Sequence, residues 1–170
     1  MLLLGLGSNL SSSFGNRFKN IDMAISYFQS YEIKIVNRSS FYETPSYPDL
    51  KNPKFINVVV DVLTHLPPED LASVLIFVEE ILERKRNQKN EPRTCDIDII
   101  DYNGKIMDFN YKNLIFKVPH EKIVYRNFVL FPLQEIAPNW RHPKTKDSID
   151  VLINKLSNED KKSILKIKKS

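Results

Sequence analysis

Two aspartates, Asp96 and Asp98, have the residue type and the spacing to hold a metal ion, and they lie in the stretch PRTCDIDII at positions 92–100. Its alternating pattern predicts a β-strand. Because strand side chains alternate between faces, both carboxylates project from one face, roughly 7 Å apart along the strand, while Ile97 and Ile99 point into the core. Two carboxylates on one face repel each other and lose hydration, so a cation is expected over them. Mg²⁺ suits two carboxylates together with a phosphate-bearing substrate.

The alternative is that the aspartates pair with the protein's own cations, Arg84, Arg86 and Arg93, and the D-x-D pattern alone does not decide between the two. These arginines lie in or next to the basic segment 84–92, and such a segment is usually a solvated face. This one leads directly into the aspartate strand. A polyphosphate bound to a metal there would lie within reach of the guanidinium groups, which are well suited to bind its remaining charge.

A second site is indicated by Phe55 and Asn57, which share one face of a predicted strand over residues 55–62. A ring beside an amide can hold a flat heterocycle, because the ring stacks on it and the amide binds its edge. The other interpretation is an edge strand packed against a helix, with Asn57 satisfied by backbone, and the pattern by itself favours that interpretation. The preceding segment, 45–54, is a long proline-containing loop, which is typical of a functional segment.

These residues need elements to position them, and the periodicity predicts alternating strands and helices. Strands are expected over residues 2–6, 32–36, 55–62, 96–100, 105–107 and 114–118, and helices over 18–28, 68–82 and 126–136. His120 follows a proline and precedes the last of these helices, so its side chain could be aimed at a cleft, although a lone histidine is more often structural.

Composition sets further bounds. A chain of 170 residues that is 42% hydrophobic suits one domain with a packed core, and no apolar run approaches the about 20 residues of a membrane span. The single cysteine, Cys95, excludes an internal disulfide and fits the reducing cytoplasm. The net charge of +4 permits an anionic ligand without demanding nucleic acid. The glycines form neither a P-loop nor a Rossmann fingerprint, and no zinc motif is present.

Several stretches together resemble the 6-hydroxymethyl-7,8-dihydropterin pyrophosphokinase family of folate biosynthesis. They occur in the family's order and at about its spacing, and they run through most of the chain, which makes the match specific. The stretches are LGSNL at 6–10, SSFYETP at 39–45, FIN at 55–57, PRTCDIDII at 92–100, VPH at 118–120 and RNFVLFPL at 126–133.

The resemblance implies an α/β (α+β) fold of the ferredoxin-like type, in which an antiparallel sheet is flanked by helices on both sides in three α-β-α layers. It implies a single pyrophosphokinase domain over residues 1–170 that transfers the diphosphate of ATP to the pterin hydroxymethyl group and leaves AMP. The expected partners are these small-molecule substrates, with no nucleic acid and no membrane. We expect a cytoplasmic monomer.

The resemblance also implies roles for individual residues. Two Mg²⁺ ions would be held by Asp96 and Asp98. The ATP triphosphate would be contacted by Arg84, Arg93, His120 and Arg126, with Arg86 as a weaker member, and the adenine would lie near Ile99 and Lys117. The pterin would be bound by Thr44, Pro45, Phe55, Asn57 and Phe128, with the two phenylalanine rings on either side of it. No general base is assigned.

Two departures from the family pattern bear on the segment 84–92. Asn90-Glu91 stands where the family usually has Trp-Gly, and Glu83 stands where it usually has Gly. The tryptophan belongs to a loop that closes over the substrates, and Glu91 would add negative charge near the phosphates. One alternative is therefore a homologue that binds pterin or ATP with weak catalysis. Another is a ferredoxin-like RNA-binding module, although paired aspartates on its sheet face would repel an RNA backbone.

Overall fold

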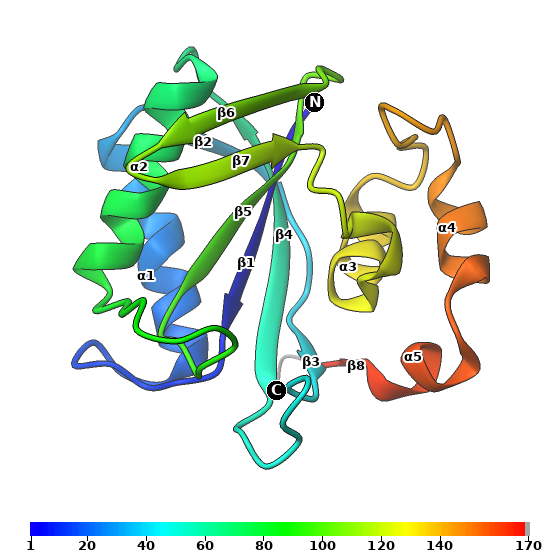
Figure 1. Cartoon of the computed structure of the whole chain (residues 1–170), viewed down its shortest axis with the longest axis horizontal. Coiled ribbons are helices and arrows are strands. Elements are labelled where there is room, and N and C mark those ends of the chain that lie inside the picture. Colours follow the sequence, from blue (N-terminus) through cyan, green and yellow to red (C-terminus); the bar gives the residue numbers. More distant parts are fainter. Residues whose placement is uncertain (169–170) are drawn as a thin grey trace.

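An antiparallel sheet forms the centre of the molecule, and the computed structural model describes residues 1–168 (Figure 1). The strand order is β5-β1-β4-β3-β8, and β2 also pairs with β4. Along the chain, β1-α1-β2-β4-α2-β5 gives the ferredoxin-like βαββαβ order. The predicted fold class is confirmed. The strands of this sheet are β1 (Leu2–Ser8), β2 (Lys34–Arg38), β3 (Tyr42–Thr44), β4 (Phe55–Leu63), β5 (Asp96–Tyr102) and β8 (Leu165–Lys166).

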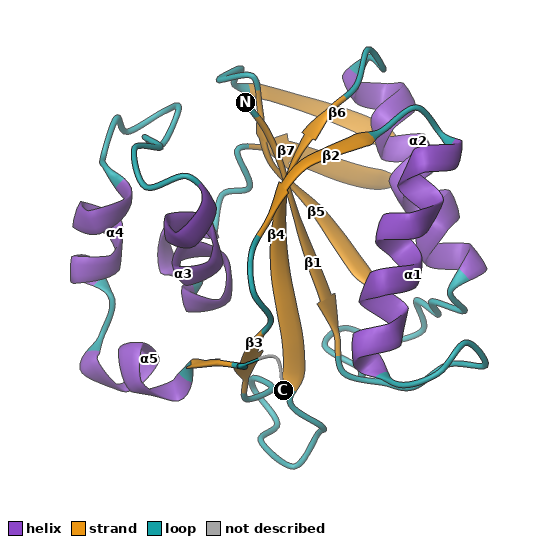
Figure 2. Ribbon diagram, turned by 180° about the vertical axis from the view of Figure 1, so that it is seen from behind, coloured by secondary structure: helices purple, strands orange, loops and turns teal. Residues whose placement is uncertain are grey.

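Helices cover both faces of the sheet, as the three-layer prediction requires (Figure 2). One face carries α1 (Arg17–Ser30) and α2 (Pro68–Ile81), and the other carries α3 (Asn127–Ile136) and α4 (Ile149–Lys155), followed by α5 (Asn158–Ser163). Because strand side chains alternate, Leu4 and Val60 pack into the α1/α2 core while Leu3 and Val59 pack into the α3/α4 core. None of the helices in residues 1–168 is long and apolar enough to cross a membrane.

A separate hairpin of β6 (Met107–Tyr111) and β7 (Leu114–Val118) follows β5. The strand predicted over 105–107 is wrong, because Asn103 and Gly104 adopt positive φ angles of 53° and 73° and the turn they form delays the strand to Met107. After β7, a short 3-10 helix, η1 (Ile123–Tyr125), leads into α3. This connection brings His120 and Arg126 close to Asp98 of β5.

The strand register places three positions in a row across the sheet. Gly7 of β1 pairs with Asp96 of β5 on one side and with Asn57 of β4 on the other. Directly paired residues point to the same face. A Cβ atom on Gly7 would lie 3.4 Å from Asn57 Oδ1 and 3.6 Å from the Phe55 ring, so the glycine keeps the space between the amide and the carboxylate open.

Candidate active site

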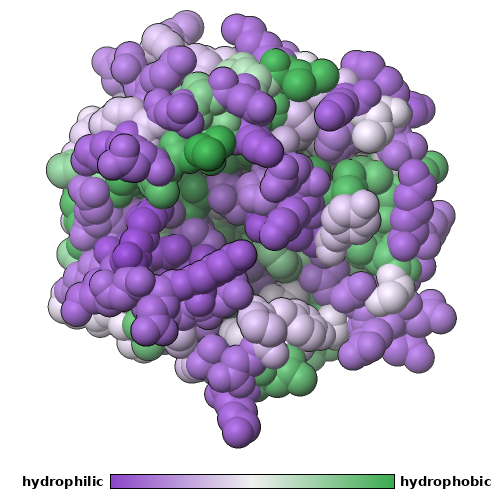
Figure 3. Space-filling view, in the orientation of Figure 1, coloured by the Kyte–Doolittle hydropathy of each residue, from purple (hydrophilic) through white to green (hydrophobic). Residues whose placement is uncertain are grey.

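Asp96 and Asp98 lie at the junction of two neighbouring cavities. The first has a volume of about 390 Å³ and the second about 250 Å³. Among the described residues that line them, only these two aspartates are common to both. The space-filling view shows a hollow near the middle of this face, edged largely by hydrophilic side chains (Figure 3). The predicted shared face of the two carboxylates is confirmed, and Ile97 and Ile99 are buried on the opposite side.

Both carboxylates are paired with guanidinium groups of the protein. Asp96 Oδ2 accepts a hydrogen bond from Arg93 at 2.9 Å, and its Oδ1 lies 3.3 Å from Arg84 Nη1. Asp98 Oδ2 accepts from Arg126 at 2.9 Å. Burial raises the pKa of the Asp98 carboxyl group, and the negative charge of Asp96 raises it further. Arg126 and His120 oppose this shift. The interpretation that the aspartates pair with arginines therefore holds for Arg84 and Arg93, while Arg86 pairs elsewhere.

The donor set also fits a hard divalent cation. Each ionised carboxylate has about four lone-pair sites, so an arginine on one oxygen leaves others available. The side chains of Asp96 and Asp98 are 32% and 37% exposed, so a cation could reach both. Residues 1–168 contain no group of three or more His, Cys, Asp or Glu side chains placed to hold a metal. A cation here would take its remaining ligands from water or from a substrate, which is the usual arrangement for Mg²⁺.

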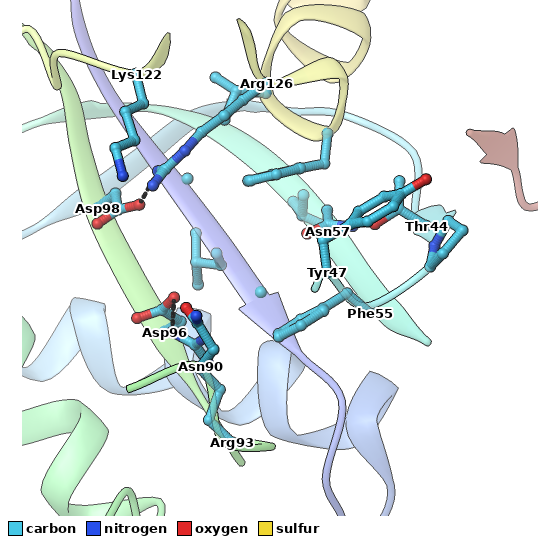
Figure 4. A pocket seen from close by; sticks show the side chains of 17 residues that line it. Thr44, Tyr47, Phe55, Asn57, Asn90, Arg93, Asp96, Asp98, Lys122 and Arg126 are labelled. Carbon is cyan, nitrogen blue, oxygen red and sulfur yellow. Dashed lines mark hydrogen bonds and ion pairs between the residues drawn. The ribbon is translucent and has the colours of Figure 1, made fainter. Parts of the chain in front are cut away.

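The first cavity combines the rings of Phe55 and Phe128, together with that of Tyr47, with a buried amide (Figure 4). Asn57 is 5% exposed, and its Nδ2 donates to Thr44 Oγ1 at 3.0 Å and to the Tyr42 carbonyl at 3.3 Å. The amide is therefore satisfied by the neighbouring strand, as the non-ligand interpretation expected, yet it also lines the cavity. That interpretation is right about the helix, since α3 packs against β4, and wrong about the edge, since β4 lies between β1 and β3 in the sheet.

The rings of Phe55 and Phe128 each lie beside a guanidinium group that also binds an aspartate. The Arg93 Cζ atom lies 5.4 Å from the centre of the Phe55 ring, and the Arg126 Cζ atom lies 5.4 Å from the centre of the Phe128 ring. Such contacts are attractive because the ring face is electron-rich. The aromatic walls and the two carboxylates are thus linked through the same pair of arginines.

The second cavity is lined mainly by charged side chains and by β7. Its predicted members are Arg84, Arg86, Ile99, Lys117 and His120. Lys117 pairs with Glu121 at 2.8 Å. Burial lowers the pKa of His120, and the charge of Asp98 opposes that shift. His120 Nδ1 accepts a hydrogen bond from the Lys122 backbone amide at 3.1 Å, which leaves Nε2 to carry the ring proton.

Every residue that the sequence predicted for the site lines one of the two cavities, but several lining or supporting residues were missed. Glu79 on α2 is 2% exposed, accepts from the Ile97 amide at 2.7 Å and pairs with Arg86. Burial and then the charge of Asp96 raise the pKa of Glu79 to about 7. A signal was available, since Glu79 comes four residues after Leu75 and so falls on the apolar face of a predicted helix.

Asn9 connects the two loops that border the site. This buried side chain donates through Nδ2 to Ser46 Oγ at 3.1 Å and to the Pro53 carbonyl at 3.0 Å. Its Oδ1 accepts from the Arg93 amide at 2.7 Å. The segment 45–54 and Arg93, the residue that follows the segment 84–92, are therefore fixed by one amide. Sequence reasoning placed Asn9 in a turn and assigned it no contact.

The two departures from the family pattern have distinct structural settings. Asn90 lines the first cavity with a φ of 63°, and Glu91 Oε1 accepts from the Asn87 amide at 2.8 Å, so the Glu91 carboxylate is used within its own loop. Glu83 has a φ of 66°, a conformation that Gly adopts without penalty, and its carboxylate accepts from Ser13 N and Ser13 Oγ. Tyr47 and Lys122 also line the first cavity and were not predicted.

Comparison with known proteins agrees with this geometry. A family described as 7,8-dihydro-6-hydroxymethylpterin-pyrophosphokinase matches residues 3–138. A 2-amino-4-hydroxy-6-hydroxymethyldihydropteridine pyrophosphokinase from Methylorubrum extorquens is 36% identical over 138 residues, which cover 80% of this chain and 82% of that protein. The "Folic acid synthesis protein fol1" of Pneumocystis carinii is 37% identical over 162 residues, 95% of this chain and 21% of that protein. The chain therefore spans about a fifth of the length of that relative.

Solved structures show the same fold at lower identity. The wild-type HPPK-DHPS of Plasmodium falciparum, crystallised with pteroate, superposes with a TM-score of 0.70 at 17% sequence identity. The match covers 91% of this chain and 44% of that chain. At this identity the likeness supports the arrangement of strands and helices rather than the chemistry.

Proposed function

The chain belongs to the 7,8-dihydro-6-hydroxymethylpterin-pyrophosphokinase family, and from this premise we propose that it transfers the diphosphate of ATP to the hydroxymethyl group of 6-hydroxymethyl-7,8-dihydropterin and releases AMP. Members of this family use ATP as a substrate. The observation that carries the proposal is the junction at Asp96 and Asp98, because the pair lies between a cavity lined by aromatic rings and an amide and a second cavity lined by Arg84 and His120, with cationic side chains in both.

The first cavity is the proposed pterin site. Phe55 and Phe128 would stack on the two faces of the bicyclic ring, and Asn57 would bind its polar edge. Thr44 and Pro45 would close the pocket from the neighbouring strand and loop. A volume of about 390 Å³ lies within the range of small-molecule sites.

The second cavity is the proposed nucleotide site. Ile99 and the segment at Lys117 would lie beside the adenine, and Arg84 and His120 would contact the triphosphate. Arg93 and Arg126 would reach the phosphates from the first cavity, where they now pair with the aspartates. Arg86 is the weakest member of this set, because Glu79 already binds it.

Asp96 and Asp98 would hold two Mg²⁺ ions, which when bound neutralise phosphate charge and polarise the phosphorus. The protein's own part is to arrange the reactants. The pterin hydroxyl oxygen bonds to the β-phosphorus and loses its proton to water, the bond from that phosphorus to the bridging oxygen breaks, and AMP leaves with that oxygen. Positioning and guanidinium charge supply much of the rate in such transfers. His120 can donate from Nε2 to the α-phosphate or the leaving oxygen, because its Nδ1 accepts from the Lys122 amide.

The proposal extends to the whole chain and its partners. We propose that residues 1–170 act as one domain, as a monomer, and on small molecules without nucleic acid. The RNA-binding alternative is not favoured, because such modules stack bases on an open sheet face. Here both faces of the sheet are covered by helices, and the cavity beside the sheet is lined by the carboxylates of Asp96 and Asp98.

The test is to mix the chain with ATP, Mg²⁺ and the reduced hydroxymethylpterin and to separate the nucleotides. Equal amounts of AMP and pterin diphosphate would support the proposal, whereas ADP would indicate transfer of the γ-phosphoryl group. Saturable binding of both substrates without AMP would support the alternative of a homologue with weak catalysis.

A further inference from the structure

Lys122 lies on the side of the aspartate pair that faces the proposed pterin site, where the acceptor would bind. The proposed mechanism gives it no role. It precedes η1 in the connection between β7 and α3, and it lines the first cavity with Asp98 and Arg126. Figure 4 shows its side chain extending beside that of Arg126 toward Asp98. Its backbone is fixed, because its amide donates to His120 Nδ1 at 3.1 Å and its carbonyl accepts from Tyr125 N at 3.0 Å.

The ammonium of Lys122 differs from the other cations of the site in its pairing. Arg84, Arg93, Arg126 and Lys117 each lie within ion-pair distance of a carboxylate. In the described part of the chain, no carboxylate lies within 4.0 Å of the Lys122 ammonium. Asp98 is already paired with Arg126, so the charge of the Lys122 ammonium is not matched by a carboxylate of its own and would be offset by a further anion. The position therefore suits an anion that arrives with a ligand.

The side on which Lys122 lies decides which anion this is. His120 lines the nucleotide cavity and not the pterin cavity, whereas Lys122 lines the pterin cavity and not the nucleotide cavity. The two residues thus lie on opposite sides of Asp98. An ATP phosphate bound among Arg84 and His120 is on the side of the nucleotide cavity, whereas the diphosphate, once bonded to the pterin oxygen, lies on the side of Lys122.

We propose that Lys122 is a phosphate-binding residue selective for the diphosphate once it is on the acceptor, contacting it in the transition state and in the pterin diphosphate product. This inference rests on the proposed function. Lys122 remains protonated throughout: the pterin oxygen–phosphorus bond forms, the bond to the AMP oxygen breaks, and the ammonium only offsets charge that moves toward it. An interaction made in the transition state but not with bound ATP raises kcat without lowering KM.

The experiment compares Lys122→Met, Lys122→Arg and a control, Lys105→Met. Methionine keeps the apolar stem without the charge, arginine keeps the charge, and Lys105 is exposed and lines neither cavity. We expect Lys122→Met to lower kcat by about 10- to 100-fold, the worth of one hydrogen bond to a charged group. We expect it to weaken equilibrium binding of the pterin diphosphate by a similar factor. KM for both substrates and binding of a non-hydrolysable ATP analogue with Mg²⁺ should change by less than about 3-fold.

Lys122→Arg tests whether charge alone restores activity, and Lys105→Met is the control. Lys122→Arg should restore most of kcat and of product binding, and Lys105→Met should match the wild type. Equal losses of ATP-analogue and product binding in Lys122→Met would overturn the selectivity, and unchanged kcat and product binding would overturn any role. The wild-type reaction distinguishes failure of the proposed function from failure of this inference. A wild type that forms no AMP contradicts the proposed function. AMP formation by the wild type and equally by Lys122→Met contradicts only the role of Lys122.

Discussion

The two cavities that meet at Asp96 and Asp98 are stabilised in different ways. The walls of the first are buried groups bonded within the sheet, since Thr44 and Asn57 are 3% and 5% exposed and bond to each other. The walls of the second are longer charged side chains bound in ion pairs, and β7 on its border belongs to a separate two-stranded hairpin. Ion pairs hold cations in both cavities, and what distinguishes the first is the buried polar wall of Thr44 and Asn57.

This difference indicates how each cavity should respond to its ligand. A pocket whose polar groups are already fixed costs little further ordering on binding and selects a ligand by shape. A pocket whose cations are already paired must exchange those pairs when a polyphosphate arrives. Changes in the first cavity should therefore affect one substrate, changes in the second should depend on charge and pH, and changes at the junction should affect both.

Replacing the junction gives the largest expected effect. Asp98→Ala removes a proposed Mg²⁺ ligand and leaves Arg126 without its carboxylate. Charge stabilisation by a metal in a transition state is worth several kcal/mol, so we expect kcat to fall by at least about 1,000-fold. AMP formation at saturating substrates measures it, with Asp108→Ala on β6 as a control outside both cavities. Near-normal turnover of Asp98→Ala would remove the junction from the mechanism.

Asn57→Ala tests whether the first cavity acts on the pterin alone. It removes the amide that would bind the pterin edge and leaves Thr44 Oγ1 without its donor. Loss of a buried hydrogen bond costs about 1–3 kcal/mol, so KM for the pterin should rise about 10- to 100-fold. Binding of a non-hydrolysable ATP analogue should be unchanged, and Asn110→Ala on β6 is the matched control. An equal loss of ATP-analogue binding would show that the cavities do not act separately.

The sequence predicted the parts of the site that follow from strand alternation. The shared face of Asp96 and Asp98, the opposite burial of Ile97 and the placement of Asn57 beside an aromatic ring needed only a period of two. The family resemblance added the residues on loops, such as His120 and Arg126, whose direction no periodicity specifies.

The missed residues depend on contacts between distant segments. Asn9 acts through Ser46, Pro53 and Arg93, which are brought to it only by the folded sheet. Lys122 looks like any exposed lysine until α3 places Arg126 beside it. Glu79 was detectable as a charge on an apolar helix face, but its partner Arg86 was assigned to the phosphates. The interior position of β4 was missed, because the order of strands in a sheet cannot be deduced from one strand.

Glu79→Gln tests the charge dependence of the second cavity. Because the pKa of Glu79 is raised from 4.5 to about 7, the folded state keeps a proton that the unfolded state loses in this interval. Stability from this group is therefore fully present below pH 4.5 and is lost as the pH rises through 7. At roughly 1.4 kcal/mol per pKa unit, we expect the slope to account for on the order of 3 kcal/mol and to be absent in Glu79→Gln.

Denaturant unfolding of both proteins between pH 4.5 and 8 measures this difference directly, and subtraction removes the groups that they share. Glu80→Gln, one residue along α2 and about half exposed, is the control, and it should keep the wild-type slope. A Glu79→Gln curve parallel to the wild type would mean that Glu79 is ionised throughout, and the second cavity would then be less sensitive to pH than its charges indicate.

The smallest expected effect concerns the roof of the first cavity, where Asn90 stands in place of the family's tryptophan. Stacking by an added ring is worth about 0.5–1.5 kcal/mol. Asn90 has a φ of 63°, however, and a bulky residue there costs about 1–2 kcal/mol. The two terms nearly cancel, so Asn90→Trp alone should change KM for the pterin by less than about 2-fold.

Adding Glu91→Gly relaxes the backbone beside residue 90, and the double variant should lower KM for the pterin by about 3- to 10-fold, with ATP-analogue binding unchanged. If Asn90→Trp alone tightened pterin binding as much as the double variant, the backbone conformation at residue 90 would not limit ring stacking. If ATP-analogue binding tightened in parallel, residue 90 would act on both cavities.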